Sequence, residues 1–107
     1  MKTLKFMPEL ATKILSGNKT STWRLFDDKD LQVDDQVNFT NRETGEQFGT
    51  ALITGVTIRT LGTLTDADWD GHERYASEEN MYEEFRKYYG PHVDPDTEVK
   101  ILTFHLK

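Results

Sequence analysis

The segment 98–107 carries apolar side chains on both faces of a predicted β-strand. Since successive side chains of a strand point to opposite faces, Val99 and Ile101 share one face. The opposite face holds three more apolar residues: Leu102, Phe104 and Leu106. A strand that is apolar on both faces is typical of the centre of a sheet or of the closure of a barrel. The segment therefore predicts a sheet that is covered on both sides.

Further strand patterns occupy the earlier part of the chain. Residues 20–25 and residues 36–41 alternate polar and apolar side chains, as a half-buried strand does. Residues 47–60 hold enough apolar positions for one or two more strands. Gly49 and Gly55 lie inside that run, where glycine favours a bulge or a barrel corner.

Helical signals lie between these strands. Residues 8–16 begin with a proline and an early glutamate, and they predict a helix with one apolar face. Residues 65–68 predict a short helix that begins with a capping box, and Ser77 begins a longer helix that ends at Gly90. We therefore expect a single α+β domain over residues 1–107, a β-barrel of roughly five or six strands with one N-terminal helix and one or two later helices.

Composition excludes several classes of function. The chain has no cysteine, which removes disulfide and thiol chemistry. Residues 1–6 lack the long apolar stretch that is typical of a signal peptide, and no apolar run reaches bilayer length, so we expect a cytoplasmic protein without membrane contact. The net charge of −6 disfavours long duplex DNA, because non-specific affinity for nucleic acids comes from neutralising phosphates. Five of the six charged residues among the first 24 are basic, which suits a small nucleoside or a short single-stranded RNA at a local basic pocket, unless this segment has no role.

We expect neither a metal nor an organic cofactor. Residues 66–71 resemble the first half of a calcium-binding EF-hand loop, but the twelfth position, which requires a bidentate glutamate, is Ser77. The three histidines are scattered along the chain without the close pairing of a zinc site.

Residues 17–24 combine a lysine, three hydroxyls and an arginine in eight positions. In a strand, Thr20, Thr22 and Arg24 share one face, which suits a polar pocket, while the opposite face suits a core. The glycine that begins the segment can end the preceding helix and turn Lys19 towards that pocket. A cation, hydroxyl oxygens and a guanidinium in one place can bind an anion or a nucleobase edge, or activate a hydroxyl nucleophile.

The order of Gly17, Lys19, Thr20, Thr22 and Arg24 resembles the G-x-K-T-x-T-x-R-like segment of the ASCH (activating signal cointegrator homology) domain family. That family is a small β-barrel relative of the RNA-binding PUA domain. The resemblance therefore implies a PUA-like fold over nearly the whole chain.

Two later features extend this resemblance. A short turn precedes the strand at residues 36–41, with Asp34 where the family usually has glycine. Aspartate tolerates the left-handed conformation better than most residues, so the turn is expected to persist. Further on, Glu79, Asn80 and Met81 look like the segment that opens a late helix in bacterial members.

Among enzymes, the chain resembles the bacterial N(4)-acetylcytidine amidohydrolases, in which a lysine, a threonine and a glutamate serve the active site and match Lys19, Thr22 and Glu79. The resemblance implies that Thr22, activated by Lys19, attacks the acyl carbonyl, and that Glu79 passes a proton to the leaving amine. Glu79 is expected to pair with Lys19 or Arg24. Substrate contacts are implied for three residues: Thr20, Arg24 and Asn80.

Each of these residues also has an ordinary structural explanation. Lys19 suits a solvated loop, a threonine such as Thr22 suits any strand, and Glu79 suits the first turn of any helix. A non-catalytic RNA-binding module would use the same pocket to hold a base or a phosphate, and a ribonuclease is a third possibility. The sequence does not indicate an oligomeric state.

Overall fold

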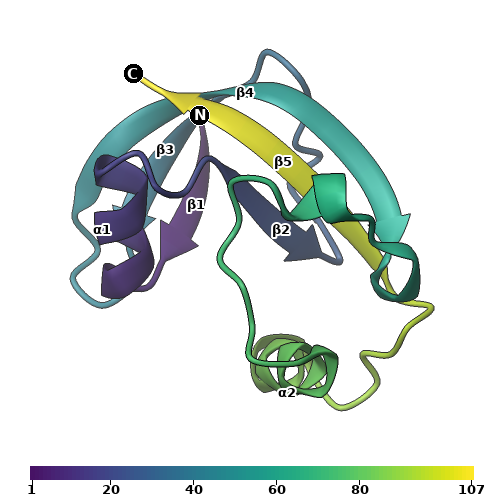
Figure 1. Ribbon diagram of the computed structural model, residues 1–107. Helices are drawn as coiled ribbons and strands as arrows, with labels where there is room; N and C mark the ends of the chain where they lie inside the picture. The colour runs from purple at the N-terminus through teal and green to yellow at the C-terminus, as the bar shows by residue number, and fades with distance from the viewer.

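Five β-strands form one curled sheet in the computed structural model, which describes residues 1–107. The strands are β1 (Lys2–Phe6), β2 (Ser21–Leu25), β3 (Gln36–Asn41), β4 (Gln47–Thr60) and β5 (Glu98–Leu106). Their order across the sheet is β1-β3-β4-β5-β2, with β1 parallel to β3 and the other neighbours antiparallel. The sheet curls into a half-barrel whose edges are β1 and β2 (Figure 1).

Two helices accompany the sheet. The first, α1 (Pro8–Leu15), links β1 to β2, and α2 (Glu78–Tyr89) lies below the open side of the arching sheet in Figure 1. Two short 3₁₀ helices, η1 (Leu61–Thr63) and η2 (Asp66–Trp69), lie between β4 and α2 in the chain. This is the α+β, PUA-like architecture that the sequence predicts, with five strands. Neither α-helix combines the length and the apolar character that crossing a membrane requires.

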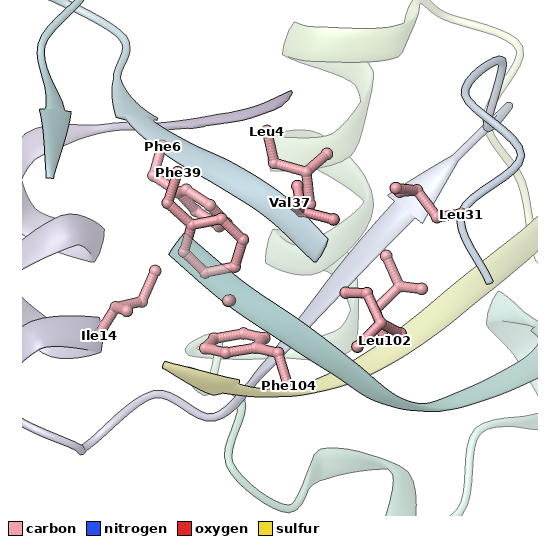
Figure 2. Close-up of a cluster of buried hydrophobic side chains, with 10 residues drawn as sticks. Leu4, Phe6, Ile14, Leu31, Val37, Phe39, Leu102 and Phe104 are labelled. Atoms are coloured by element: carbon pink, nitrogen blue, oxygen red, sulfur yellow. The ribbon is translucent and has the colours of Figure 1, made fainter. Parts of the chain in front are cut away.

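Strand β5 is buried on both faces, as its pattern predicts. Leu102 and Phe104 belong to a first core cluster of ten buried side chains, which Figure 2 shows. Val99 and Ile101 belong to a second core cluster of nine, which includes Trp23 and the buried face of α2. Because β5 also pairs with β4 on one side and β2 on the other, it joins the two clusters through both its side chains and its backbone.

Capping residues set the ends of the later helices. Thr65 and Asp68 form the predicted capping box, although it begins the 3₁₀ turn η2 rather than an α-helix. The Ser77 hydroxyl accepts a hydrogen bond from the Asn80 backbone N–H at 3.0 Å and begins α2. Gly90, with φ at 106°, ends it.

The bulge predicted at Gly55 lies within one long strand, β4, rather than between two shorter strands. The register of β4 against β5 shifts between Ile53 and Gly55, so a single 14-residue strand follows the curl of the sheet through a bulge. Asp34 adopts the expected left-handed conformation, with φ at 74°. The sequence pattern does not predict β1, because its five residues offer only Leu4 and Phe6 as buried positions and its pairing with β3 is long-range.

Candidate functional site

A cavity of about 420 Å³ opens between the two edge strands, the chain after η2, and α2. Thr22 and Arg24 of β2 and Phe6 of β1 form part of its wall. Residues 72–76 and one side of α2 also line it, together with Arg42 and with Glu9 and Leu10 of α1. A cavity of this size accommodates a small organic ligand such as a nucleoside.

A buried ion pair lies at this cavity. Lys19 Nζ donates to Glu73 Oε2 at 2.5 Å, and the lysine is only 2% exposed. Burial lowers the pKa of Lys19, and the Glu73 carboxylate opposes that shift. Burial would raise the pKa of Glu73, but His72 and Lys19 outweigh it and hold that pKa below its usual value. Glu73, which lines the cavity, is therefore ionised at neutral pH.

The turn at Gly71 places Glu73 beside Lys19. Gly71 has φ at 74°, and its carbonyl accepts hydrogen bonds from the backbone N–H groups of Thr20 at 2.8 Å and Ser21 at 3.1 Å. These two bonds fasten the chain after η2 to the start of β2. Glu73 follows two residues later and reaches a lysine that lies 54 positions earlier in the sequence.

His72 packs beside the ion pair as a neutral ring. Its imidazole stacks on Trp23, with centroids 4.1 Å apart and planes at 20°. Its Nδ1 lies 2.7 Å from the Glu73 carbonyl oxygen, and because that oxygen only accepts, Nδ1 carries the proton. Burial, followed by the charge of Lys19, lowers the pKa of His72 to about 4. At neutral pH, Lys19 is therefore the cation that keeps Glu73 ionised.

Thr22 and Arg24 reach the cavity from the same face of β2. Thr22 is 4% exposed, and the Lys19 amine donates to Glu73 rather than to the Thr22 hydroxyl. Arg24 Nη2 donates to the Lys5 carbonyl at 3.2 Å, so a side chain bridges the two edge strands. Burial lowers the pKa of Arg24, and Tyr89 opposes that shift.

The structure places Thr20 and Asn80 differently. Asn80, in the first turn of α2, lines the cavity with Thr22 and Arg24. Thr20 is exposed and lines a separate cavity next to Gly71. Its predicted contact with a ligand would therefore be made outside the main cavity.

The structure does not bring Glu79 to Lys19. Because Ser77 caps α2, Glu79 lies in the first helical turn, where its side chain is exposed and does not line the cavity. The expected pairing of Glu79 with Lys19 or Arg24 is therefore wrong, because Lys19 pairs with Glu73 and Arg24 donates to the Lys5 carbonyl.

The sequence pattern does not identify Glu73 and His72 as site residues. Helix capping explains the pattern of residues 66–71, and no spacing rule relates the two residues that follow to the lysine at position 19. The only signal was Gly71, because a glycine after a short helix favours a left-handed turn that redirects the chain.

The acidic and histidine side chains do not form a metal centre. No group of three or more of them gathers closely enough to hold an ion, and the half-loop at residues 66–71 is absorbed by η2 and its cap. Asp68 accepts from the Thr65 backbone N–H at 2.8 Å and pairs with Arg59 at 3.1 Å.

Comparison with solved structures shows that this chain has the fold of ASCH domains. A protein from Enterococcus faecalis V583, described by the family model DUF984, matches with a TM-score of 0.76 at 16% identity over 99% of this chain and 80% of that one. The ASCH domain from Lactobacillus crispatus JV V101 matches with a TM-score of 0.72 at 18% identity over 98% and 79% of the two chains. The ASCH protein from Zymomonas mobilis matches with a TM-score of 0.61 at 19% identity over 96% and 65%.

Comparisons of sequence add no further relative. No family model matches the chain, and no curated protein matches it either. The resemblance drawn from residues 17–24 is thus confirmed for the fold, through structures whose sequences are less than one fifth identical to this chain.

Proposed function

We propose that the cavity binds a pyrimidine nucleoside and hydrolyses an acyl group from its exocyclic amine, as in N(4)-acetylcytidine. The observation that carries this proposal is the Glu73 carboxylate, ionised by the buried Lys19, in the same cavity as the Thr22 hydroxyl. A hydroxyl nucleophile and a carboxylate that can move its proton are the two groups that acyl transfer requires.

The proposed reaction has two steps: Thr22 is first acylated, and the resulting ester is then hydrolysed. Its hydroxyl attacks the acyl carbonyl carbon while its proton passes to Glu73, and the C–N bond breaks as Glu73 gives that proton to the exocyclic nitrogen. Cytidine leaves, and the acetyl group remains as an ester on Thr22. Water then loses a proton to Glu73 and attacks the ester carbonyl carbon, and the bond between that carbon and the Thr22 oxygen breaks as Glu73 returns the proton to this oxygen. Acetic acid leaves and loses its own proton to solvent. Lys19 keeps Glu73 ionised between the steps.

The walls of the cavity suit a flat base with polar edges. Phe85, Tyr88 and Tyr89 of α2 offer aromatic faces to a base. Arg24 and Asn80 offer donors and an acceptor to its exocyclic groups. Aromatic walls with a few polar groups are the usual construction of a small-molecule site.

The test is the hydrolysis of N(4)-acetylcytidine by the purified protein, followed as the appearance of cytidine by chromatography. We expect Thr22→Val to abolish turnover while keeping a side chain of similar shape. We expect Glu73→Gln to lower kcat by about 10²- to 10⁴-fold, the usual contribution of general acid–base catalysis. Glu79→Gln serves as the matched control, because the exposed Glu79 does not line the cavity, and it should retain the wild-type kcat.

Two results would contradict this assignment. Full activity in Thr22→Val would remove the covalent step, and loss of activity in Glu79→Gln with full activity in Glu73→Gln would exchange the proposed roles of the two glutamates. Circular dichroism of each variant separates lost chemistry from lost folding.

The second candidate function is a non-catalytic RNA-binding module. It is favoured by Tyr88, which is 57% exposed at the cavity and lies 5.9 Å from the Arg42 guanidinium, since an exposed ring beside a cation suits a stacked base. Binding of a short single-stranded RNA that weakens with salt, without any release of cytidine from an acetylated substrate, would favour this function over the first.

A further inference from the structure

Unpaired cations concentrate at the cavity of an acidic protein. Of the 13 lysines and arginines in this chain, five form salt bridges with carboxylates: Lys2, Lys19, Arg59, Lys87 and Lys100. Of the other eight, four line the cavity: Lys5, Arg24, Arg42 and Arg74. With a net charge of −6, the composition alone would not place half of the unpaired cations around one opening.

The carboxylates of the cavity do not neutralise these cations. Glu73 is bound by Lys19, and Glu84 pairs with Lys87 at 2.9 Å. Glu9 is the one remaining carboxylate in the lining, and it forms no ion pair. The cavity therefore holds a local excess of positive charge, which attracts an anion.

Backbone and side-chain hydrogen bonds place three of the four cationic residues, Lys5, Arg24 and Arg42, next to one another in the fold. Since β1 runs parallel to β3, the ends of both strands meet, and Arg42 follows β3 where its backbone N–H donates to the Phe6 carbonyl at 2.8 Å. Lys5 precedes Phe6, and its carbonyl accepts from Arg24 at 3.2 Å. Lys5 and Arg42 are exposed, whereas Arg24 is half-buried.

We infer that the natural ligand carries a phosphate on its nucleoside, bound by Lys5 and Arg42 at the rim while the base occupies the aromatic part of the cavity. This inference rests on the proposed function, because it places a nucleoside there. An uncharged nucleoside would leave these cations without a counter-charge, whereas a phosphate gives them charge-assisted hydrogen bonds, with a bidentate contact available to the arginine. The phosphate belongs either to a free nucleotide or to one nucleotide of an RNA strand.

The experiment compares three substrates: N(4)-acetylcytidine, its 5′-monophosphate, and a trinucleotide with acetylcytidine in the middle. For the wild-type protein, we expect kcat/KM for a phosphorylated substrate to exceed that for the nucleoside by about a hundredfold, and this preference to fall about tenfold for each cation removed in Lys5→Gln and Arg42→Gln. The control is the double variant Lys29→Gln/Lys107→Gln, which changes the net charge as much as both substitutions together. Neither control residue lines the cavity, so the preference should be retained.

Comparing the three substrates distinguishes a free nucleotide from an RNA strand as the natural ligand. A preference for the monophosphate identifies a free nucleotide, and a preference for the trinucleotide over the monophosphate identifies an RNA strand. If the nucleoside is hydrolysed as well as both phosphorylated forms, this inference is overturned while the proposed function stands. If none of the three is hydrolysed and none binds, both fail. A preference for phosphorylated substrates that persists in the double variant Lys5→Gln/Arg42→Gln would also overturn the inference that these two residues bind a phosphate.

Discussion

The pairing of Lys19 with Glu73 explains how a lysine can lie almost fully inside a small protein. A buried ammonium without a partner would lose its proton or destabilise the fold, and Glu73 supplies both a counter-charge and a hydrogen bond. The same contact leaves the carboxylate ionised at the cavity. One ion pair thus serves the fold and the proposed chemistry, so variants at either residue require a folding control.

His72 makes the free energy of unfolding depend on pH between its pKa in the folded protein and its pKa in the unfolded chain. In the folded protein its pKa is about 4, against 6.5 for an ordinary histidine, because burial and then the charges of Lys19 and Arg24 lower it more than Glu73 raises it. Below pH 6.5 the unfolded chain binds a proton there that the folded protein does not bind. The free energy of unfolding should therefore decrease as the pH falls from 6.5 to 4, by about 3 kcal/mol from this group.

Urea unfolding at several pH values measures this effect. His72→Gln should have a flatter dependence than the wild type over this window, whatever its stability at neutral pH. His105→Gln changes an exposed histidine of β5 and should keep the wild-type slope. Identical slopes in all three proteins would show that His72 does not carry the effect, since the carboxylates that titrate in the same range are common to them.

At the level of single residues, the sequence predicted half of the ion pair. Lys19, Thr22 and Arg24 could be recognised because they lie within one short segment whose strand periodicity places two of them on one face. Glu73 could not, because its position depends on the turn at Gly71 and on a contact between distant parts of the chain. A motif near a helix start favoured Glu79 instead.

At the level of elements, the turn at Gly71 tests how the chain after η2 is held to β2. A Cβ at this position would overlap the Thr20 hydroxyl, whereas Gly45, with the same φ of 74°, has nothing within 4 Å. Gly45→Ala should cost only the left-handed conformation, about 1–2 kcal/mol. Gly71→Ala should cost about 1–3 kcal/mol more, from the overlap and the displacement it forces.

Urea unfolding and turnover provide the two measurements. Gly71→Ala should also lower activity, because it moves Glu73, while Gly45→Ala should not. The double variant Gly71→Ala/Thr20→Ala should recover part of the lost stability, since it removes the overlapping hydroxyl. Equal losses for the two glycine variants would refute a steric role for this turn.

The elements differ in how clearly their residues predict them, and the difference has a physical reason. Alternating residues, or apolar residues on both faces, predict strands β3, β4 and β5. The capping serine and the final glycine predict α2. Strand β1 has too few buried positions to form a recognisable period, and its partner lies more than 30 residues away. Such edge strands are defined by pairing rather than by local pattern.

At the level of the whole molecule, β5 should make the two core clusters unfold together. Leu102 is fully buried in the first cluster, while both tryptophans, Trp23 and Trp69, lie in or against the second. Leu102→Ala should destabilise the protein by about 2–5 kcal/mol. Tryptophan fluorescence and far-ultraviolet circular dichroism should then shift to the same lower urea midpoint, because one strand carries both clusters.

His105→Ala, on the same strand but exposed, should leave both midpoints near their wild-type values. Two separate midpoints in Leu102→Ala would mean that the tryptophan cluster holds together on its own. The half-barrel would then behave as two units despite its continuous sheet.

The guanidinium of Arg24 connects β1 and β2, the two edge strands of the sheet, which do not pair with each other through backbone hydrogen bonds. The same guanidinium carbon lies 4.9 Å from the centroid of the Phe6 ring, so two contacts of one side chain connect the margins of the half-barrel. A variant without this side chain would lose both contacts at once, at the wall of the cavity.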